Sequence, residues 1–162
     1  MKGILVYYSL NGHTRYVAKE IAQRIGLETL ELETVKDYPK GKFAQFFRCG
    51  RQTLLGLTPN LKAYDFNEAN YDLIVLGTPV WASSYAAPLE TFFKENHLKR
   101  KQVAVYACSS GGNAEKCFSK VEAKVGELVA TLSLIDPTEQ DHGKDASKIE
   151  AFCQAIKERP NK

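Results

Sequence analysis

Six residues near the start of the chain have the composition of an anion-binding loop. The segment Ser9 to Thr14 has a hydroxyl group at each end, a side-chain amide at Asn11, then Gly12 and His13. An apolar run, Ile4 to Tyr8, precedes it, and apolar residues at helical spacing follow. The N–H groups and dipole at a helix N-terminus favour a bound anion. We therefore predict a phosphate site, although an ordinary strand-to-helix turn uses the same residue types.

Two later segments could contact other parts of a ligand. Thr78 to Ala87 contains the only tryptophan, Trp81, whose flat face could stack on a planar ring, and Tyr85 is a second candidate wall. Ser109 to Asn113 presents small residues and two glycines, so its backbone N–H groups could approach a ligand closely. Simpler interpretations are also open: Trp81 as a core residue, and the glycine-rich segment as a helix entry.

Strands and helices alternate along the chain. Apolar or alternating patterns predict strands at 4–8, 28–33, 71–77, 103–108 and 129–135. Helical spacing predicts one helix that ends near Ile25 and others at 43–55, 88–93, 114–125 and 146–156. This order predicts an α/β fold of one domain, residues 1–162: a doubly wound, five-stranded parallel sheet between two layers of helices. The strict alternation at 28–33 favours an edge strand.

The predicted fold brings the three segments together. In doubly wound sheets, ligands bind outside the carboxyl ends of the strands, where the strand order reverses. The loops that begin at Ser9, Thr78 and Ser109 all follow such strand ends. We therefore expect one site that combines a phosphate-binding loop, an aromatic side chain for stacking and a row of backbone N–H donors.

Composition and charge narrow the possible functions. The chain has 162 residues, of which 44% are hydrophobic and 25% charged, with a net charge of +3. No apolar run is long enough to span a membrane, and the first residues lead into a strand instead of a signal peptide, so we expect a cytoplasmic protein. Short basic clusters without interleaved aromatic residues argue against nucleic acid. Four separated cysteines and three scattered histidines predict reduced thiols and no metal site.

The three segments resemble those of flavodoxin-like proteins that bind flavin mononucleotide (FMN). In that family a loop of the form Ser/Thr-x-Thr/Asn-Gly-x-Thr wraps the phosphate, and SLNGHT is similar to it. The segment GTPVWASSYAAPL corresponds to the one that flanks the flavin ring, so Pro79, Val80, Trp81 and Ala82 would line the isoalloxazine. The segment ACSSGGN looks like the one that contacts the pyrimidine edge.

The resemblance implies FMN as the cofactor and a strand order of 2-1-3-4-5. The cofactor-binding residues that it implies are Ser9, Asn11, Gly12, His13, Thr14, Thr78, Pro79, Val80, Trp81, Ala82, Ser109, Ser110, Gly111 and Gly112. Two features depart from flavodoxins proper, which are usually acidic and have an aspartate- and tyrosine-rich third loop. This chain is slightly basic, and its third loop reads Ser-Ser-Gly-Gly-Asn. A short-chain flavodoxin-like domain is the closest description.

Two functions follow from the resemblance. The first is an electron carrier that exchanges electrons with a redox partner protein. The second is an oxidoreductase that takes electrons from NAD(P)H and reduces quinones or similar small molecules. No side chain stands out as an acid, base or nucleophile, and Cys108 is interpreted as a buried thiol. The predicted helix at 43–55 is more apolar, at Phe43, Phe46 and Phe47, than burial of one face requires.

Overall fold

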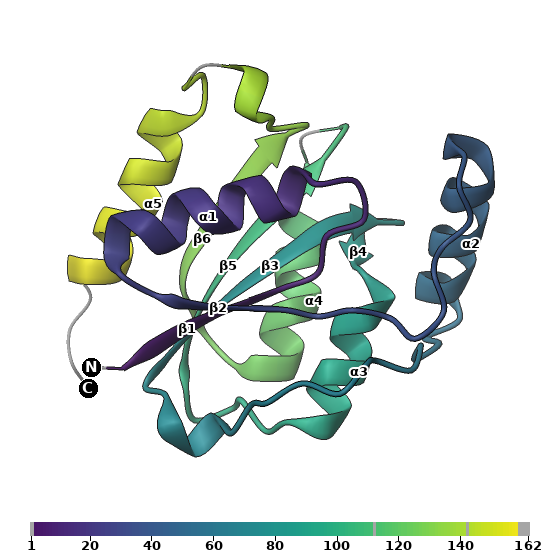
Figure 1. Ribbon diagram of the computed structural model, residues 1–162. Coiled ribbons are helices and arrows are strands. Elements are labelled where there is room, and N and C mark those ends of the chain that lie inside the picture. The colour runs from purple at the N-terminus through teal and green to yellow at the C-terminus, as the bar shows by residue number, and fades with distance from the viewer. Residues whose placement is uncertain (1, 112, 142, 159–162) are drawn as a thin grey trace.

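Five parallel strands form the central sheet of the computed structural model, which describes residues 2–111, 113–141 and 143–158 (Figure 1). They are β1 (Gly3–Tyr7), β2 (Glu28–Glu31), β3 (Leu73–Trp81), β5 (Gln102–Ser109) and β6 (Leu128–Ile135). Their order across the sheet is β2-β1-β3-β5-β6. Counted along the chain, the five parallel strands therefore follow the expected order 2-1-3-4-5, and the doubly wound α/β fold is confirmed.

The apolar runs predicted as buried strands have both faces covered. In β1, Ile4 and Val6 belong to the core on one face of the sheet, whereas Leu5 and Tyr7 belong to the core on the other. Because successive side chains of a strand point to opposite faces, a central strand covered on both sides has to be apolar throughout. β2 lies at the edge of the sheet, as its alternating pattern predicted.

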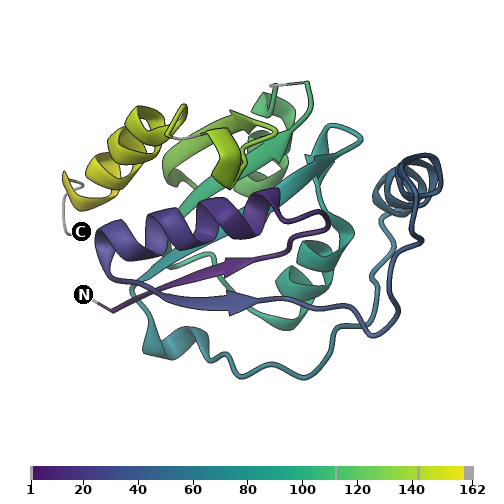
Figure 2. The same ribbon diagram turned by 45° about the horizontal axis from the view of Figure 1, so that its top comes forward.

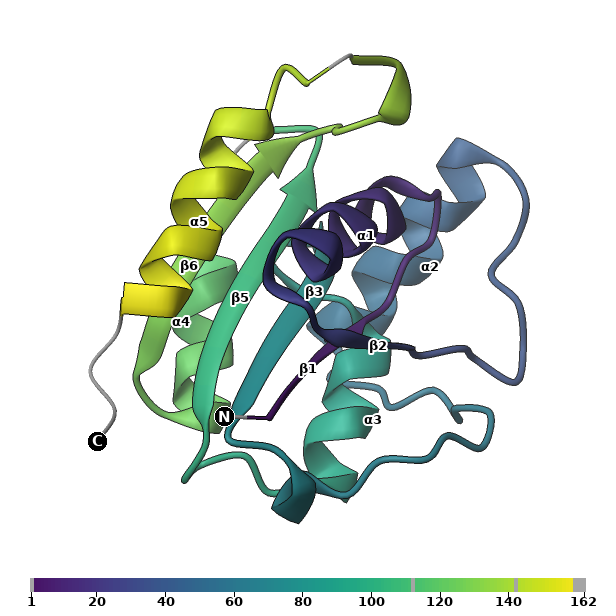
Figure 3. The ribbon, with the colours of Figure 1, turned by 60° about the vertical axis from the view of Figure 1, so that its left-hand side comes forward.

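The helices form a layer on each face of the sheet (Figure 3). α1 (His13–Ile25) and α5 (Ala146–Glu158) pack on one face, where Ile21 and Phe152 are buried. α3 (Ala87–Glu95) and α4 (Glu115–Val125) pack on the other. Gly26 caps the C-terminus of α1: its φ of 68° is left-handed, and its N–H donates to the Ala22 carbonyl at 2.8 Å. This is the glycine cap that the sequence predicted.

The segment after Gly77 differs from its prediction as a loop. β3 continues to Trp81, and the two-residue strand β4 (Ser84–Tyr85) pairs antiparallel with it, Val80 opposite Tyr85. The turn residues Ala82 and Ser83 have φ values of 48° and 57°. Two consecutive left-handed residues match the twist of a hairpin, but neither residue is a glycine or an asparagine. The usual sequence signal for a hairpin turn is therefore missing.

α2 (Lys42–Leu54) stands apart from the two helical layers (Figures 1 and 2). Cys49 is its only buried residue. Two neighbouring connections support the helix: the N–H of Val35 donates to the Asn60 carbonyl at 2.9 Å, and the N–H of Lys62 donates to the Glu33 carbonyl at 2.8 Å. The second connection contains the short 3₁₀ helix η1 (Glu68–Asn70), and a second one, η2 (Glu139–Asp141), precedes α5.

Candidate functional site

A cavity of about 1160 Å³ lies at the carboxyl ends of β1, β3 and β5. The predicted site residues that line it are Asn11, His13, Thr14, Pro79, Val80, Trp81, Ala82, Ser109 and Ser110. The structure therefore brings all three predicted segments to one place. Ser9, Gly12, Thr78 and Gly111 are not among the lining residues, and Gly112 lies outside the described residues.

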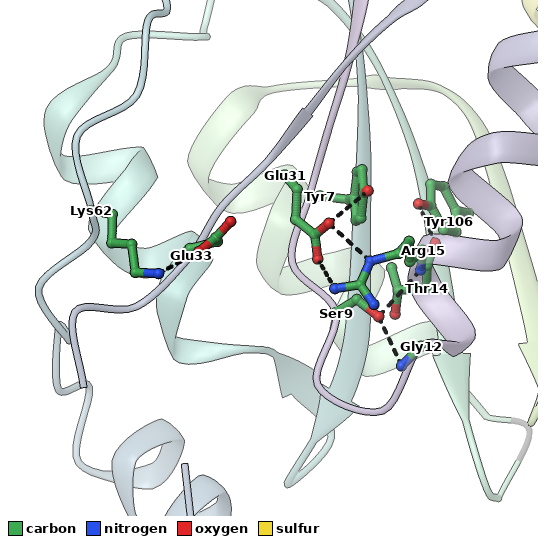
Figure 4. Close-up of polar contacts among 9 residues, drawn as sticks. All are labelled: Tyr7, Ser9, Gly12, Thr14, Arg15, Glu31, Glu33, Lys62 and Tyr106. Atoms are coloured by element: carbon green, nitrogen blue, oxygen red, sulfur yellow. Dashed lines mark hydrogen bonds and ion pairs between the residues drawn. The ribbon is translucent and has the colours of Figure 1, made fainter. Parts of the chain in front are cut away.

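The first loop holds the N-terminus of α1 open toward this cavity. Gly12 is the N-cap, with a left-handed φ of 94° that favours glycine. The Ser9 hydroxyl oxygen accepts from the N–H groups of Gly12 and Arg15, both at 3.2 Å (Figure 4). Of the N–H groups in the first turn, those of His13 and Thr14 then have no partner within the helix. These two N–H groups can hold an anion without any basic side chain.

Arg15 is close to this loop, but its guanidinium is already paired. It donates two hydrogen bonds to the Glu31 carboxylate, at 2.9 and 2.5 Å, and the Tyr7 hydroxyl donates to the same carboxylate at 3.0 Å (Figure 4). Burial, and secondly the charge of Glu31, raise the pKa of Tyr7 to about 12. The network ties α1 to β1 and β2, so the anion site depends on backbone N–H groups and hydroxyls.

Two long-range hydrogen bonds position the same loop. The Tyr106 hydroxyl donates to the Thr14 carbonyl at 2.9 Å, and the His13 Nδ1 donates to the Pro137 carbonyl at 2.8 Å. Tyr106 is fully buried in β5, and its ring crosses the neighbouring strand at Gly77. A Cβ atom at Gly77 would lie 2.2 Å from Tyr106 Cζ, so only glycine leaves room for this contact. Figure 4 shows Tyr106 beside Thr14.

The hairpin of β3 and β4 forms a second wall of the cavity. The buried Thr78 hydroxyl accepts from the N–H of Ala86 at 2.9 Å and donates to the Pro79 carbonyl at 2.8 Å. Thr78 therefore braces the hairpin from inside. Its role in binding a cofactor stays a prediction.

Trp81 belongs to both the core and the cavity. Only 8% of its surface is exposed, and its ring packs edge-to-face against Tyr8 and Tyr38, with centroids 5.7 and 5.2 Å apart. Its remaining surface lines the cavity. Tyr85, the other candidate wall, does not line it, and the Tyr85 hydroxyl donates to Glu90 at 2.5 Å. Of the two predicted aromatic walls, the structure therefore places only Trp81 at the cavity.

The third segment supplies Ser109 and Ser110, and the hydroxyl of Ser110 donates to the Asp136 carboxylate at 3.2 Å. Asp136 and Thr138 also line the cavity. Neither residue was predicted from the sequence, because both follow the last strand in a stretch that carries no recognisable motif.

The wall formed by α2 is the main part of the cavity that was not predicted from the sequence. Its lining residues are Lys42, Gln45, Phe46, Phe47, Cys49, Gly50, Arg51 and Leu54. The excess of apolar residues at 43–55 was the signal in the sequence. This excess could indicate a core, a ligand site or a partner surface, depending on where the helix lies, and the sequence did not show that position.

All four cysteines are free, and all four are buried, whereas burial was predicted for Cys108 alone. Burial raises the pKa of Cys108 to about 12, although a hydrogen bond from Thr14 acts in the opposite direction. Burial likewise raises the pKa of Cys117 to about 12 and that of Cys49 to about 11. Among the described residues, no cluster of potential metal ligands is found. Nor does any described helix have the length and hydrophobicity needed to cross a bilayer.

These thiols are expected to be unreactive in the folded protein. With a pKa near 12, only on the order of one Cys108 in ten thousand is a thiolate at pH 8, and the thiolate is the reactive form. Titration with a disulfide dye at pH 8 should label almost none of the four cysteines in buffer and all four in guanidinium. Rapid labelling of one cysteine in the native protein would contradict this assignment.

The fold and the cavity define the class of protein. Doubly wound parallel sheets bind their ligands outside the carboxyl ends of the strands, and the cavity lies there, beside a helix N-terminus. The sequence model of the flavodoxin family matches residues 2–136, and the chain belongs to this family. A comparison with curated proteins found no match.

Solved structures share the fold over nearly their whole length. A candidate flavoprotein from Bacteroides eggerthii is 20% identical, with a TM-score of 0.77 over 98% of this chain and 99% of that one. A flavoprotein from Lactobacillus acidophilus in complex with FMN is 24% identical, with a TM-score of 0.72 over 87% and 97%. Oxidised flavodoxin 2 from Bacillus cereus is 20% identical, with a TM-score of 0.56 over 98% and 99%.

Proposed function

We propose that the chain binds FMN in the cavity and serves in electron transfer. The observation that carries this proposal is that one cavity connects the open N-terminus of α1, the Trp81 hairpin and the Ser109–Ser110 segment. Membership of the flavodoxin family supports it, as does the FMN complex of the Lactobacillus acidophilus flavoprotein. Bound FMN would supply one- and two-electron chemistry.

The donor groups at the cavity fit the two ends of FMN. The N–H groups of His13 and Thr14 would hold the phosphate, since no basic side chain of the loop is free to do so. The Thr14 hydroxyl, which donates to the Cys108 thiol in this structure, would turn to the phosphate when FMN binds. Trp81 and Pro79 would flank the ring, and the third segment would present polar groups to its edge. The protein would thereby orient the cofactor and limit its exposure to water.

The visible absorption spectrum tests the proposal. Purified protein incubated with FMN and dialysed should retain a flavin spectrum at about one FMN per chain. Riboflavin, which lacks the phosphate, should be retained less well. A protein that takes up neither flavin would refute the proposed function and leave the fold assignment intact.

Replacing Trp81 with phenylalanine should increase the fluorescence of bound FMN several-fold. Indole donates electrons to an excited flavin more readily than a phenyl ring does, so a tryptophan beside the ring quenches its emission. Tyr85→Phe is the matched control, because Tyr85 is buried in the same hairpin but does not line the cavity. Unchanged emission from a fully loaded Trp81→Phe protein would show that Trp81 serves only the core.

The size of the cavity favours a second candidate function, an NAD(P)H-dependent oxidoreductase of quinones or similar small molecules. Its volume of about 1160 Å³ exceeds the roughly 300 to 1,000 Å³ of most small-molecule sites, so a second molecule has room beside the cofactor. NAD(P)H oxidation with a quinone and no added reductase separates the two functions. Absence of turnover by the FMN-loaded protein would exclude the enzyme.

The identity of the electron donor and the cytoplasmic location of the protein stay predictions.

A further inference from the structure

The face of α2 that lines the cavity is strongly apolar and largely uncovered. Phe46, Phe47 and Leu54, which line the cavity, are 76%, 62% and 76% exposed. Phe43, which lies next to Phe47 but does not line the cavity, is 78% exposed. The rings of Phe43 and Phe47 lie 4.9 Å apart between centroids, so the phenylalanines form one cluster. Large apolar side chains gathered on one surface usually mark a binding site.

The spacing along α2 gives this face a notch. Phe46, Gly50 and Leu54 are four residues apart and therefore form one row on the helix surface. Gly50 has no side chain, and a Cβ atom built there would meet nothing within 4 Å. A flat apolar group can thus lie against the backbone between Phe46 and Leu54, with Phe47 beside it.

The charges on α2 are all positive. The helix contains Lys42, Arg48 and Arg51 and no acidic residue. Lys42 and Arg51 line the cavity, and no ion pair involves either of them within the described part of the chain. Arg51 is in the row of Phe43 and Phe47, one turn beyond Phe47. Asp136, the acidic residue among those lining the cavity, accepts from Ser110.

We infer that the α2 side of the cavity binds a small planar aromatic anion, with its rings on Phe46, Gly50 and Phe47 and its negative group at Arg51. The inference deepens the proposed function, on which it rests, by naming the class of small molecule that the same cavity receives. The apolar face selects the rings, and the unpaired guanidinium of Arg51 selects a carboxylate or a sulfonate.

Two matched probes test this inference: naphthalene-2-sulfonate and the neutral naphthalene-2-sulfonamide. Calorimetric titration of the FMN-loaded protein should show the sulfonate binding at least fivefold more tightly. In the variant Arg51→Gln, this preference should fall to about one. The control Lys40→Gln, which removes an exposed charge that does not line the cavity, should keep the preference. Phe47→Ala should weaken both probes by a similar factor.

Titration with FMN in the same samples separates the two hypotheses. If the protein takes up no FMN, the proposed function fails, and both probes are then titrated into the cofactor-free protein. Equal affinity for the two probes, or a preference that survives Arg51→Gln, would overturn the inference while FMN binding stands. A stable dimer that binds neither probe and that Phe46→Ser dissociates would also overturn it, because α2 would then be a surface for a second copy.

Discussion

Replacing Gly77 with alanine is expected to lower the free energy of unfolding by about 3 kcal/mol, the upper part of the range for overpacked cores. The new Cβ atom would lie 2.2 Å from the Tyr106 ring, and that ring is fully buried. The two residues are register partners in the adjacent strands β3 and β5, so neither backbone can move away without breaking the sheet. Thermal unfolding should show a midpoint lower by about 6 to 12 °C.

Gly50→Ala is the matched control for this experiment. Its Cβ atom meets nothing within 4 Å, and alanine favours a helix interior, so the midpoint should stay the same or rise slightly. Combining Gly77→Ala with Tyr106→Leu should recover part of the lost stability, because leucine does not reach across β3. A Gly77→Ala protein as stable as the parent would show that the Tyr106 ring can adopt another position without loss of stability.

Replacing Thr14 with valine is expected to weaken FMN binding by about 10- to 100-fold, the loss of one hydrogen bond to a charged group. Valine has nearly the same shape as threonine, so the buried position, 1% exposed, stays filled. Riboflavin is the matched ligand: its affinity should change by less than about twofold, since it has no phosphate for the hydroxyl to contact. Both affinities can be read from the quenching of flavin fluorescence on binding.

Equal losses for FMN and riboflavin would contradict the assignment of Thr14 to the phosphate. Such a result would instead mean that the substitution disturbs the loop as a whole. The Thr14 carbonyl accepts from Tyr106 at 2.9 Å, and valine preserves this backbone bond. A general loosening of the loop is therefore not expected.

Much of the fold could be read from local patterns. A strand covered on both faces is apolar throughout, as in the run Ile4 to Tyr8, whereas a strand with one exposed face alternates, as at 28–33. The sheet accordingly has β1 in its interior and β2 at its edge. The glycine cap at Gly26 likewise depends only on backbone sterics within one turn. The loop from Ser9 to Thr14 was recognisable because a helix N-terminus requires particular residue types at particular spacings.

Other features depended on contacts between residues far apart in the sequence. The hairpin after Gly77 has Ala82 and Ser83 in left-handed conformations, which no turn motif predicts, and the internal hydrogen bonds of Thr78 stabilise it. The fit between Gly77 and Tyr106 exists only because β3 and β5 are neighbours in register.

The sequence by itself therefore determined the order of strands and helices and the loop at the N-terminus of α1, because these follow from short-range sterics and periodic burial. Only the tertiary structure decided that α2 stands over the strand ends and turns Phe46, Phe47 and Arg51 toward the cavity. An apolar helix surface looks the same in the sequence whether it faces a core, a ligand or a partner. In this protein, the chain segments before and after α2 hold the helix beside the cavity. One of the contacts between these segments is the hydrogen bond from the Val35 N–H to the Asn60 carbonyl.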